Sequence, residues 1–264
     1  MNPQDLDNKQ LAKFTTFAEQ LADLARESIL PHFRTQLDME QKVDDSPVTA
    51  VDRNTEARIR QVIATQYPRH GIFGEEHGST DGDDNFTWVI DPIDGTKNFL
   101  CGIPLFGSLI SLLANQTPVI GVIDLPGLKE RWVGAIHQPT VMNGRRCQTS
   151  SCQQISQAKV GATSIDLFEG ENLDKFNRTC RDARFRCFGG DCSLYAHLAS
   201  GYIDLVIEAD LAPYDFFALI PVVEGAGGTI TDWRGHKLNF KSDGRIIAAA
   251  TAQLHAEALI SLSD

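Results

Sequence analysis

The chain lacks both a long apolar run and an export-type leader. Of its 264 residues 42% are hydrophobic, yet no apolar stretch reaches the roughly 18 residues that a membrane span requires. The first residues, MNPQDLDNKQ, contain neither a basic segment nor an apolar one. We therefore expect no membrane partner and a cytoplasmic location.

Cysteine pairs at short spacing are also missing. The chain has 6 cysteines, and none of them forms a CxxC pair. A structural zinc site needs clustered Cys or His ligands, which this spacing does not offer. A disulfide framework is possible by count, but a chain of this length has core enough without one. We expect reduced, mostly structural thiols.

Basic residues are scarce relative to acidic ones. The chain carries 24 Lys and Arg against 35 Asp and Glu, a formal net charge of −11. Nucleic acids are bound by clustered Lys and Arg, so this balance argues against a nucleic-acid partner. A small phosphorylated metabolite stays compatible, because divalent cations invert the sign of an acidic cleft.

Apolar spacing predicts helices first and strands thereafter. Helical periodicity runs from Asp5 to about Leu30, and again from Asp52, a plausible N-cap, to Tyr67. The segment between them, Lys42–Asp52, suits a turn or short hairpin. Strand patterns then occur in four segments, and Asn143-Gly144 marks a hairpin. These segments are Thr87–Ile90, Phe106–Leu113, Val119–Leu125 and Arg131–Ile136.

The second half alternates helical and strand patterns. Helices are predicted at Leu173–Ala183, at Cys192–Ser200, after Asp215 and at the C-terminus, and strands at Arg184–Phe188, Tyr202–Glu208 and Thr229–Trp233. Mixed sheets with helices layered between and outside them satisfy this order, which places the chain in the α/β (α+β) class. We expect a single domain, residues 1–264, with two lobes of about 1–137 and about 138–264.

The strongest chemical signal is the segment Asp91-Pro92-Ile93-Asp94-Gly95-Thr96, directly after the strand pattern TWVI. Proline cannot continue a strand ladder and glycine permits a tight turn, so the chain bends here. Such a bend can aim two carboxylates and a freed carbonyl at one point, and these are the oxygen ligands that Mg²⁺ accepts. A helix starting near Gly95 would present N–H groups to a phosphate. The alternative is a simple Asp-Pro turn with a capping Asp.

Three further acids indicate a functional site only when they are considered together. Glu75 is followed by a second Glu in a loop, a pattern that is usually just solvated. Asp215 precedes an apolar run and could be a helix N-cap. Asp44 could be an ordinary turn acid.

Taken in order, these motifs closely resemble the inositol monophosphatase family, over nearly the whole chain. The matching elements are K-x-D-x-S-P-V-T (Lys42–Thr49), G-E-E (Gly74–Glu76), W-V-I-D-P-I-D-G-T (Trp88–Thr96), Y-D-F-F-A (Tyr214–Ala218) and E-G-A-G-G (Glu224–Gly228). The resemblance implies an α-β-α-β-α sandwich, usually dimeric, that hydrolyses small phosphate monoesters with two or three Mg²⁺ ions.

The resemblance also implies roles for individual residues. The metal ligands would be Glu75, Asp91, the Ile93 carbonyl, Asp94 and Asp215. Glu75 and Thr96 would orient the attacking water, Gly95 and Thr96 would bind phosphate, and Asp44 would assist a third metal ion. In the inositol-specific branch that last acid stands nearer the Val-Thr pair, where this chain has Ser46, so the likeness to that branch is weaker.

Three longer segments resemble the histidinol-phosphatase branch: Gly95–Leu113, Gly189–Gly228 and Thr231–Leu238. Asp191 and Glu208 fall where members of the family contact the alcohol part of the substrate. An acid at Asp191 favours a leaving alcohol with positive charge, and histidinol carries an ammonium and a titratable imidazole. Alternatively, Asp191 caps the helix that begins near Cys192.

The favoured function is thus Mg²⁺-dependent hydrolysis of L-histidinol phosphate, a step of histidine biosynthesis. An inositol-, sugar- or nucleotide-phosphate phosphatase is the alternative within the same fold. A non-catalytic metal- or metabolite-binding homologue would be expected to have lost a ligand carboxylate, and this chain retains them all.

Overall fold

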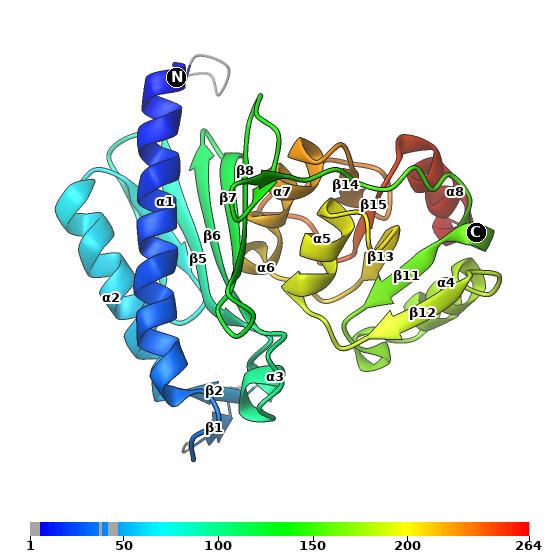
Figure 1. Cartoon of the computed structure of the whole chain (residues 1–264), viewed down its shortest axis with the longest axis horizontal. Helices are drawn as coiled ribbons and strands as arrows, with labels where there is room; N and C mark the ends of the chain where they lie inside the picture. The colour runs from blue at the N-terminus through cyan, green and yellow to red at the C-terminus, as the bar shows by residue number, and fades with distance from the viewer. Residues whose placement is uncertain (1–5, 37–38, 42–46, 264) are drawn as a thin grey trace.

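Two β-sheets and three sets of helices stack as alternating layers in the computed structural model of the protein, which describes residues 6–36, 39–41 and 47–263 (Figure 1). Helices α1 and α2 cover one face of the larger sheet, α5, α6 and α7 lie between the two sheets, and α4 and α8 cover the outer face of the smaller sheet. Three apolar cores fill the junctions between layers: one beneath α1 and α2, one around the middle helices and against both sheets, and one beneath α4 and α8. The predicted α-β-α-β-α sandwich is confirmed.

The first helical layer consists of α1 (Asn8–Ile29) and α2 (Ala50–Gln66). The start of α2 differs from the prediction that Asp52 is its N-cap. Thr49 is the cap, and its hydroxyl accepts the N–H of Val51 at 3.1 Å. Asp52 stands at the third helical position and accepts the N–H of Thr49 at 3.0 Å, which completes a capping box. The short strands β1 (Met39–Gln41) and β2 (Pro47–Thr49) pair antiparallel just before α2.

The larger sheet has the strand order β10-β9-β8-β7-β6-β5-β3-β4. The predicted antiparallel meander and the hairpin at Asn143-Gly144 are both present. Strand β3 was not predicted, because its sequence GIFG is too short to show a period. The strands are β3 (Gly71–Gly74), β4 (Gly78–Thr80), β5 (Phe86–Asp94), β6 (Gly107–Ala114), β7 (Thr117–Leu125), β8 (Glu130–Ala135), β9 (Val141–Met142) and β10 (Arg145–Arg146).

Alternation along β5 decides which side chains reach the middle layer. Trp88 and Ile90 pack against α1 and α2, whereas Val89 belongs to the core on the other face. Asp91 has the same parity as Val89, so it points toward the middle helices. Two glycines of the sheet let the chain around α7 come close: a Cβ at Gly121 would lie 2.0 Å from the carbonyl oxygen of Ala218, and one at Gly134 would lie 2.3 Å from that of Pro221.

The smaller sheet has the order β12-β11-β13-β15-β14. In β13, Leu205 and Ile207 pack in the outer core, while Val206 packs in the middle one. Glu208 shares the parity of Val206 and therefore faces the middle layer as well. Strands β11 and β15 were not predicted. The strands are β11 (Lys159–Ala162), β12 (Phe185–Phe188), β13 (Leu205–Glu208), β14 (Thr229–Asp232) and β15 (Ile246–Ala249).

The remaining helices are short and several differ from the predicted bounds. They are α3 (Thr96–Leu100), α4 (Glu171–Thr179), α5 (Cys192–Ala199), α6 (Pro213–Phe216), α7 (Leu219–Gly225) and α8 (Ala252–Ser263). Within the described ranges, no helix combines the length and apolarity that crossing a membrane requires. The 6 cysteines are all free thiols, as expected. The larger sheet extends to Arg146, past the lobe boundary expected near residue 137, and the division into two lobes stays a prediction.

Candidate active site

A β-bulge at the end of β5 builds the first part of the site. The strand was predicted to stop at Asp91-Pro92, but it continues to Asp94. Its pairing with β6 shifts register between Asp91, opposite Leu109, and Asp94, opposite Gly107. Pro92 lies in the bulge, where the strand ladder does not require a hydrogen bond from its backbone nitrogen, so the absence of an N–H costs nothing. The carbonyl of Pro92 accepts a hydrogen bond from the hydroxyl of Ser108 at 2.7 Å. The bulge re-aims the carboxylates that follow it.

Three carboxylates converge beside this bulge. One oxygen from each of Asp91, Asp94 and Asp215 lies within 4.8 Å of the other two. Asp91 is 2% exposed and accepts the N–H of Ile93 at 3.0 Å. Asp94 accepts the N–H of Cys192, the first residue of α5, at 2.6 Å. The segments that carry these acids lie far apart in sequence, and the middle layer brings them together.

Asp215 does not occupy the helix N-cap that was one interpretation of its position. The N-cap of α6 is Ala212, and Asp215 stands at the third helical position, where it accepts the N–H of Ala212 at 2.7 Å. This contact ties its carboxylate, which also takes part in the acidic cluster, to the start of α6. A capping contact and a place in the acidic cluster are therefore combined in one residue.

The electrostatics of the cluster fit a divalent cation. Burial and the neighbouring carboxylates raise the pKa of Asp91 and of Asp215 well above the ordinary range. Burial likewise raises the pKa of Asp94 to about 6, against the hydrogen bonds from Cys192 that lower it. Hard anionic oxygens that repel one another at this separation are the ligand set that Mg²⁺ and similar cations neutralise. The residues present thus suit the metal dependence of the resembling family.

Glu75 joins the cluster from the turn that follows β3. Its backbone N–H donates to the carbonyl of Ile90 at 3.2 Å, which fixes the turn against β5. The charge of its carboxylate is one of the causes of the raised pKa of Asp91, and Glu75 lines the same pocket. The fold therefore brings one of the two adjacent acids beside Asp91, the condition under which the Glu75-Glu76 pair was expected to matter.

Gly95 and Thr96 begin α3, as predicted, and face the pocket. Gly95 has φ 80°, and a Cβ there would lie 2.9 Å from the Oδ2 atom of Asp191. Both the left-handed backbone and this close approach require glycine. The hydroxyl of Thr96 donates to the carbonyl of Ile93 at 3.0 Å. The side chain of Ile93 is buried in the core beneath α1, so only its carbonyl could reach a ligand.

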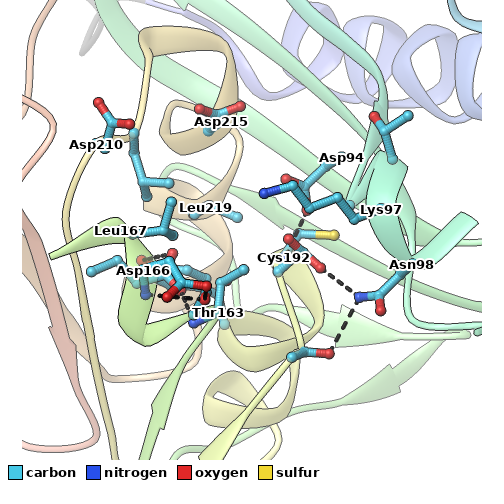
Figure 2. A pocket seen from close by; sticks show the side chains of 18 of the residues that line it. Asp94, Lys97, Asn98, Thr163, Asp166, Leu167, Cys192, Asp210, Asp215 and Leu219 are labelled. Carbon is cyan, nitrogen blue, oxygen red and sulfur yellow. Dashed lines mark hydrogen bonds between the residues drawn. The ribbon is translucent and has the colours of Figure 1, made fainter. Parts of the chain in front are cut away.

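The acidic cluster opens into a cavity of about 380 Å³. Figure 2 shows Asp94, Lys97 and Asn98 on one side of it and Thr163, Asp166, Leu167 and Asp210 on the other. Asp191 and Glu208 line the same cavity. The structure thus brings all the candidate residues that it describes to one site, apart from the buried side chain of Ile93. Asp44 lies outside the described residues.

Asp191 occupies the N-cap position of α5, but its side chain does not cap the helix. It accepts a hydrogen bond from the amide of Asn98 at 2.6 Å, and Asp94 takes the N–H at the start of α5 instead. The interpretation of Asp191 as a helix cap is therefore wrong for its side chain. Burial, reinforced by the charge of Asp94, raises its pKa to about 7.

Glu208 faces Asp191 from the smaller sheet. Its carboxylate accepts the N–H of Thr163 at 2.6 Å and the hydroxyl of Tyr195 at 3.4 Å. Burial raises its pKa to about 7 even though the bond from Thr163 lowers it. A carboxyl group with a pKa near 7 in a cavity ionises readily when a cation binds beside it.

Sequence reasoning missed several residues that line this cavity. Asn98, which holds Asp191, was not singled out, and Lys97 was left without a role. Asp166 and Asp210 add two acids to the far side. Asn98 lies inside a segment that resembles the histidinol-phosphatase branch, which could have identified it. Asp210 carried no signal beyond its charge.

Known proteins are similar to this chain along most of its length. A sequence model described as the inositol monophosphatase family matches residues 10–264. The bifunctional phosphatase IMPL2, chloroplastic, of Arabidopsis thaliana is 42% identical over 270 residues, which cover 99% of this chain and 78% of that protein. A histidinol-phosphatase of Chlorobaculum parvum is 35% identical over 88% of this chain and 90% of its own length. The solved structure of an inositol monophosphatase from Zymomonas mobilis is similar with a TM-score of 0.88 and 41% identity, covering 96% of this chain and 98% of that one.

Proposed function

Because the chain belongs to the inositol monophosphatase family and is a phosphatase of that family, we propose that its substrate is L-histidinol phosphate, which it hydrolyses to L-histidinol and phosphate. The observation that carries this choice is the pair Asp191 and Glu208, a half-buried and a buried acid that line the same cavity as the metal cluster. A substrate with an ammonium group neutralises them, and a neutral alcohol does not.

The metal ligands in this proposal are Glu75, Asp91, the Ile93 carbonyl, Asp94 and Asp215. Two or three Mg²⁺ ions bound there would neutralise the phosphate and lower the pKa of the attacking water. Hard oxygen donors and excess negative charge in the cluster support this ligand set.

The chain's own groups then position the reactants. Since the Thr96 hydroxyl donates its hydrogen to Ile93, its oxygen is available as an acceptor for a water molecule. Glu75 accepts a proton from that water, and the amides of Gly95 and Thr96 hold a phosphate oxygen at the start of α3. The proposed role of Asp44 with a third ion depends on a residue outside the described ranges.

The alcohol side of the reaction depends on the second group of acids. Asn98 holds Asp191 at 2.6 Å and Thr163 holds Glu208 at 2.6 Å, so neither carboxylate must be ordered when the substrate binds. These preorganised groups bind the ammonium or imidazolium of histidinol. We also propose, on the family resemblance, that the protein acts as a homodimer in the cytoplasm.

Hydrolysis of inositol 1-phosphate is the second candidate. The likeness to the Zymomonas mobilis inositol monophosphatase favours it, at 41% identity over nearly the whole of both chains. Carboxylates can accept hydrogen bonds from the hydroxyl groups of a polyol, so the cavity is chemically compatible with this ester.

Phosphate release in the presence of MgCl₂ tests the proposal. The comparison is of kcat/KM for L-histidinol phosphate, inositol 1-phosphate and 3′-phosphoadenosine 5′-phosphate. A preference of about a hundredfold for histidinol phosphate, near 2.7 kcal/mol of transition-state discrimination, is the expected result. Comparable rates on all three esters would contradict the choice of substrate. No release from any would remove the catalytic assignment and favour a binding protein.

A further inference from the structure

A buried carboxylate on α2 lies directly behind the turn that carries Glu75. The side chain of Glu56 is fully buried, at 0% exposure. One of its oxygens accepts the N–H of Glu76 at 2.7 Å, and the other accepts the N–H of His77 at 3.2 Å. Both amides belong to the residues that follow Glu75. The carboxylate therefore binds the backbone of the turn with both of its oxygens.

Arg60 completes this arrangement one helical turn later. Its Nε donates to Glu56 at 2.7 Å, and this ion pair compensates the buried charge. The end of its guanidinium donates to the carbonyl of Gly78 and, at 3.1 Å, to the hydroxyl of Thr80. Helix α2 thus holds the turn between β3 and β4 at several backbone atoms, while Ile90 of β5 holds the N–H of Glu75 from the other side.

Gly74, the residue just before Glu75, leaves room for the carboxylate of Glu56 because it has no side chain. A Cβ at Gly74 would lie 2.1 Å from the Oε1 atom of Glu56, so the carboxylate rests against the bare Cα. The carboxylate of Glu56 contacts only the backbone N–H groups of Glu76 and His77, so substitution of either side chain would not remove these hydrogen bonds. They act instead on the direction in which the turn presents Glu75 to Asp91.

We propose that Glu56 is a positioning residue, which sets the carboxylate of Glu75 beside Asp91 by holding the backbone of Glu76 and His77. The inference rests on the proposed function, in which Glu75 is a metal ligand and orients the water. Glu56 itself is buried behind the turn and is not among the residues that line the cavity. Its effect should therefore fall on metal binding and on turnover, and leave binding of the alcohol part intact.

The test replaces Glu56 by glutamine, which keeps the volume but offers one acceptor oxygen and a donor amide in place of two acceptors. For Glu56→Gln we expect kcat to fall roughly 10–100-fold, the Mg²⁺ concentration for half-maximal activity to rise by a similar factor, and KM for the phosphate ester to stay within about threefold. In metal-free protein, the amides of Glu76 and His77 should exchange with deuterium faster than in the wild type.

Ile63→Ala serves as the matched control, because Ile63 is fully buried on the same helix and its apolar side chain can form no hydrogen bond with the turn. This variant should lose stability while keeping kcat and the exchange rates of the turn amides. Gly74→Ala should reproduce the effect of Glu56→Gln by crowding the carboxylate out of its place, and it serves as the second variant if Glu56→Gln does not fold.

Three outcomes would overturn the inference, and they are distinguishable. If the wild type hydrolyses a phosphate ester and Glu56→Gln matches it in kcat, Mg²⁺ dependence and amide exchange, Glu56 has no positioning role. An equal loss of kcat in Ile63→Ala at matched stability leads to the same conclusion. A wild type that shows no Mg²⁺-dependent hydrolysis would overturn the proposed function and this inference together.

Discussion

The cavity has two groups of acids that differ in how their charge is held. In the metal group, Asp91, Asp94 and Asp215 turn one oxygen each toward a common point, all within 4.8 Å. In the substrate group, Asp191 and Glu208 are each fixed by a separate donor, Asn98 and Thr163. Under the proposed function, carboxylates thus form a shared site for a divalent ion in one place and separate contacts for single charges in the other.

This difference has an electrostatic consequence. Burial is the largest cause of the raised pKa values of Asp91 and Asp215, and repulsion from the neighbouring carboxylates, which a divalent cation would relieve, raises them further. Burial is also the largest cause in the substrate group, where the pKa values are about 7 for both Asp191 and Glu208. The first group should therefore control whether the enzyme works, and the second which ester it prefers.

The largest expected effect comes from Asp94→Asn. It removes one ligand charge at nearly constant volume and leaves an oxygen to accept the N–H of Cys192. We expect kcat/KM to fall at least about a thousandfold, near 4 kcal/mol, on every phosphate ester, with little loss of folding. The measurement is phosphate release with MgCl₂ alongside thermal unfolding of the metal-free protein.

Asp174→Asn is the matched control, since Asp174 is an exposed acid on α4, on the outer face of the smaller sheet. It undergoes the same chemical change and should retain activity. Wild-type-like turnover in Asp94→Asn would show that the cluster at the end of β5 is not the metal site.

A smaller and selective effect is expected from Asp191→Asn. Loss of a contact between a carboxylate and an ammonium costs about 1.5–3 kcal/mol, so kcat/KM for L-histidinol phosphate should fall roughly 10–100-fold. The value for inositol 1-phosphate should change by less than about threefold, because a neutral alcohol gains little from the charge. Equal losses on the two esters would remove the electrostatic argument for the substrate and merge the roles of the two groups.

The smallest effect concerns stability as a function of pH. Folding raises the pKa of Asp94 to about 6 and those of Asp191 and Glu208 to about 7. Because these pKa values are raised in the folded state, protonation of the three groups stabilises the metal-free protein. This stabilisation is complete below about pH 4, the ordinary pKa of a carboxyl group, and is lost as the pH rises through about 6 to 7. The Tm of metal-free protein should therefore fall between pH 5.5 and pH 8, by a few degrees.

Addition of MgCl₂ should reverse that trend, because the cation favours the ionised carboxylates. At a concentration about a hundred times its Kd, Mg²⁺ adds about 2.7 kcal/mol of stability, and the gain in Tm should be larger at pH 8 than at pH 5.5. Differential scanning calorimetry at both pH values measures this gain. A gain independent of pH would mean that the raised pKa of Asp94 is not linked to metal binding.

Local chemistry made much of this site predictable. Pro92 and Gly95 predict a bend, and the acids around them predict a charged site. The helix start at Gly95 is also local, because its left-handed backbone conformation is one that only glycine adopts without cost. The meander of β6, β7 and β8 was predictable because alternating apolar residues and turn signals are local. The end of β5 was misjudged because a bulge keeps the ladder going past a proline, and only the partner strand reveals it.

The sequence by itself determined which residue types the site has and, through the resemblance, the family and its five-layer fold. Only the tertiary structure decided how these residues meet: that Asp94 rather than Asp191 binds the start of α5, that Asn98 holds Asp191, and that Glu56 holds the turn of Glu75. The physical reason is the separation in sequence between the residues that interact. Periodicity, turns and caps depend on residues a few positions apart, whereas Asn98 and Asp191 are separated by 93 positions and meet only because the middle layer packs between two sheets.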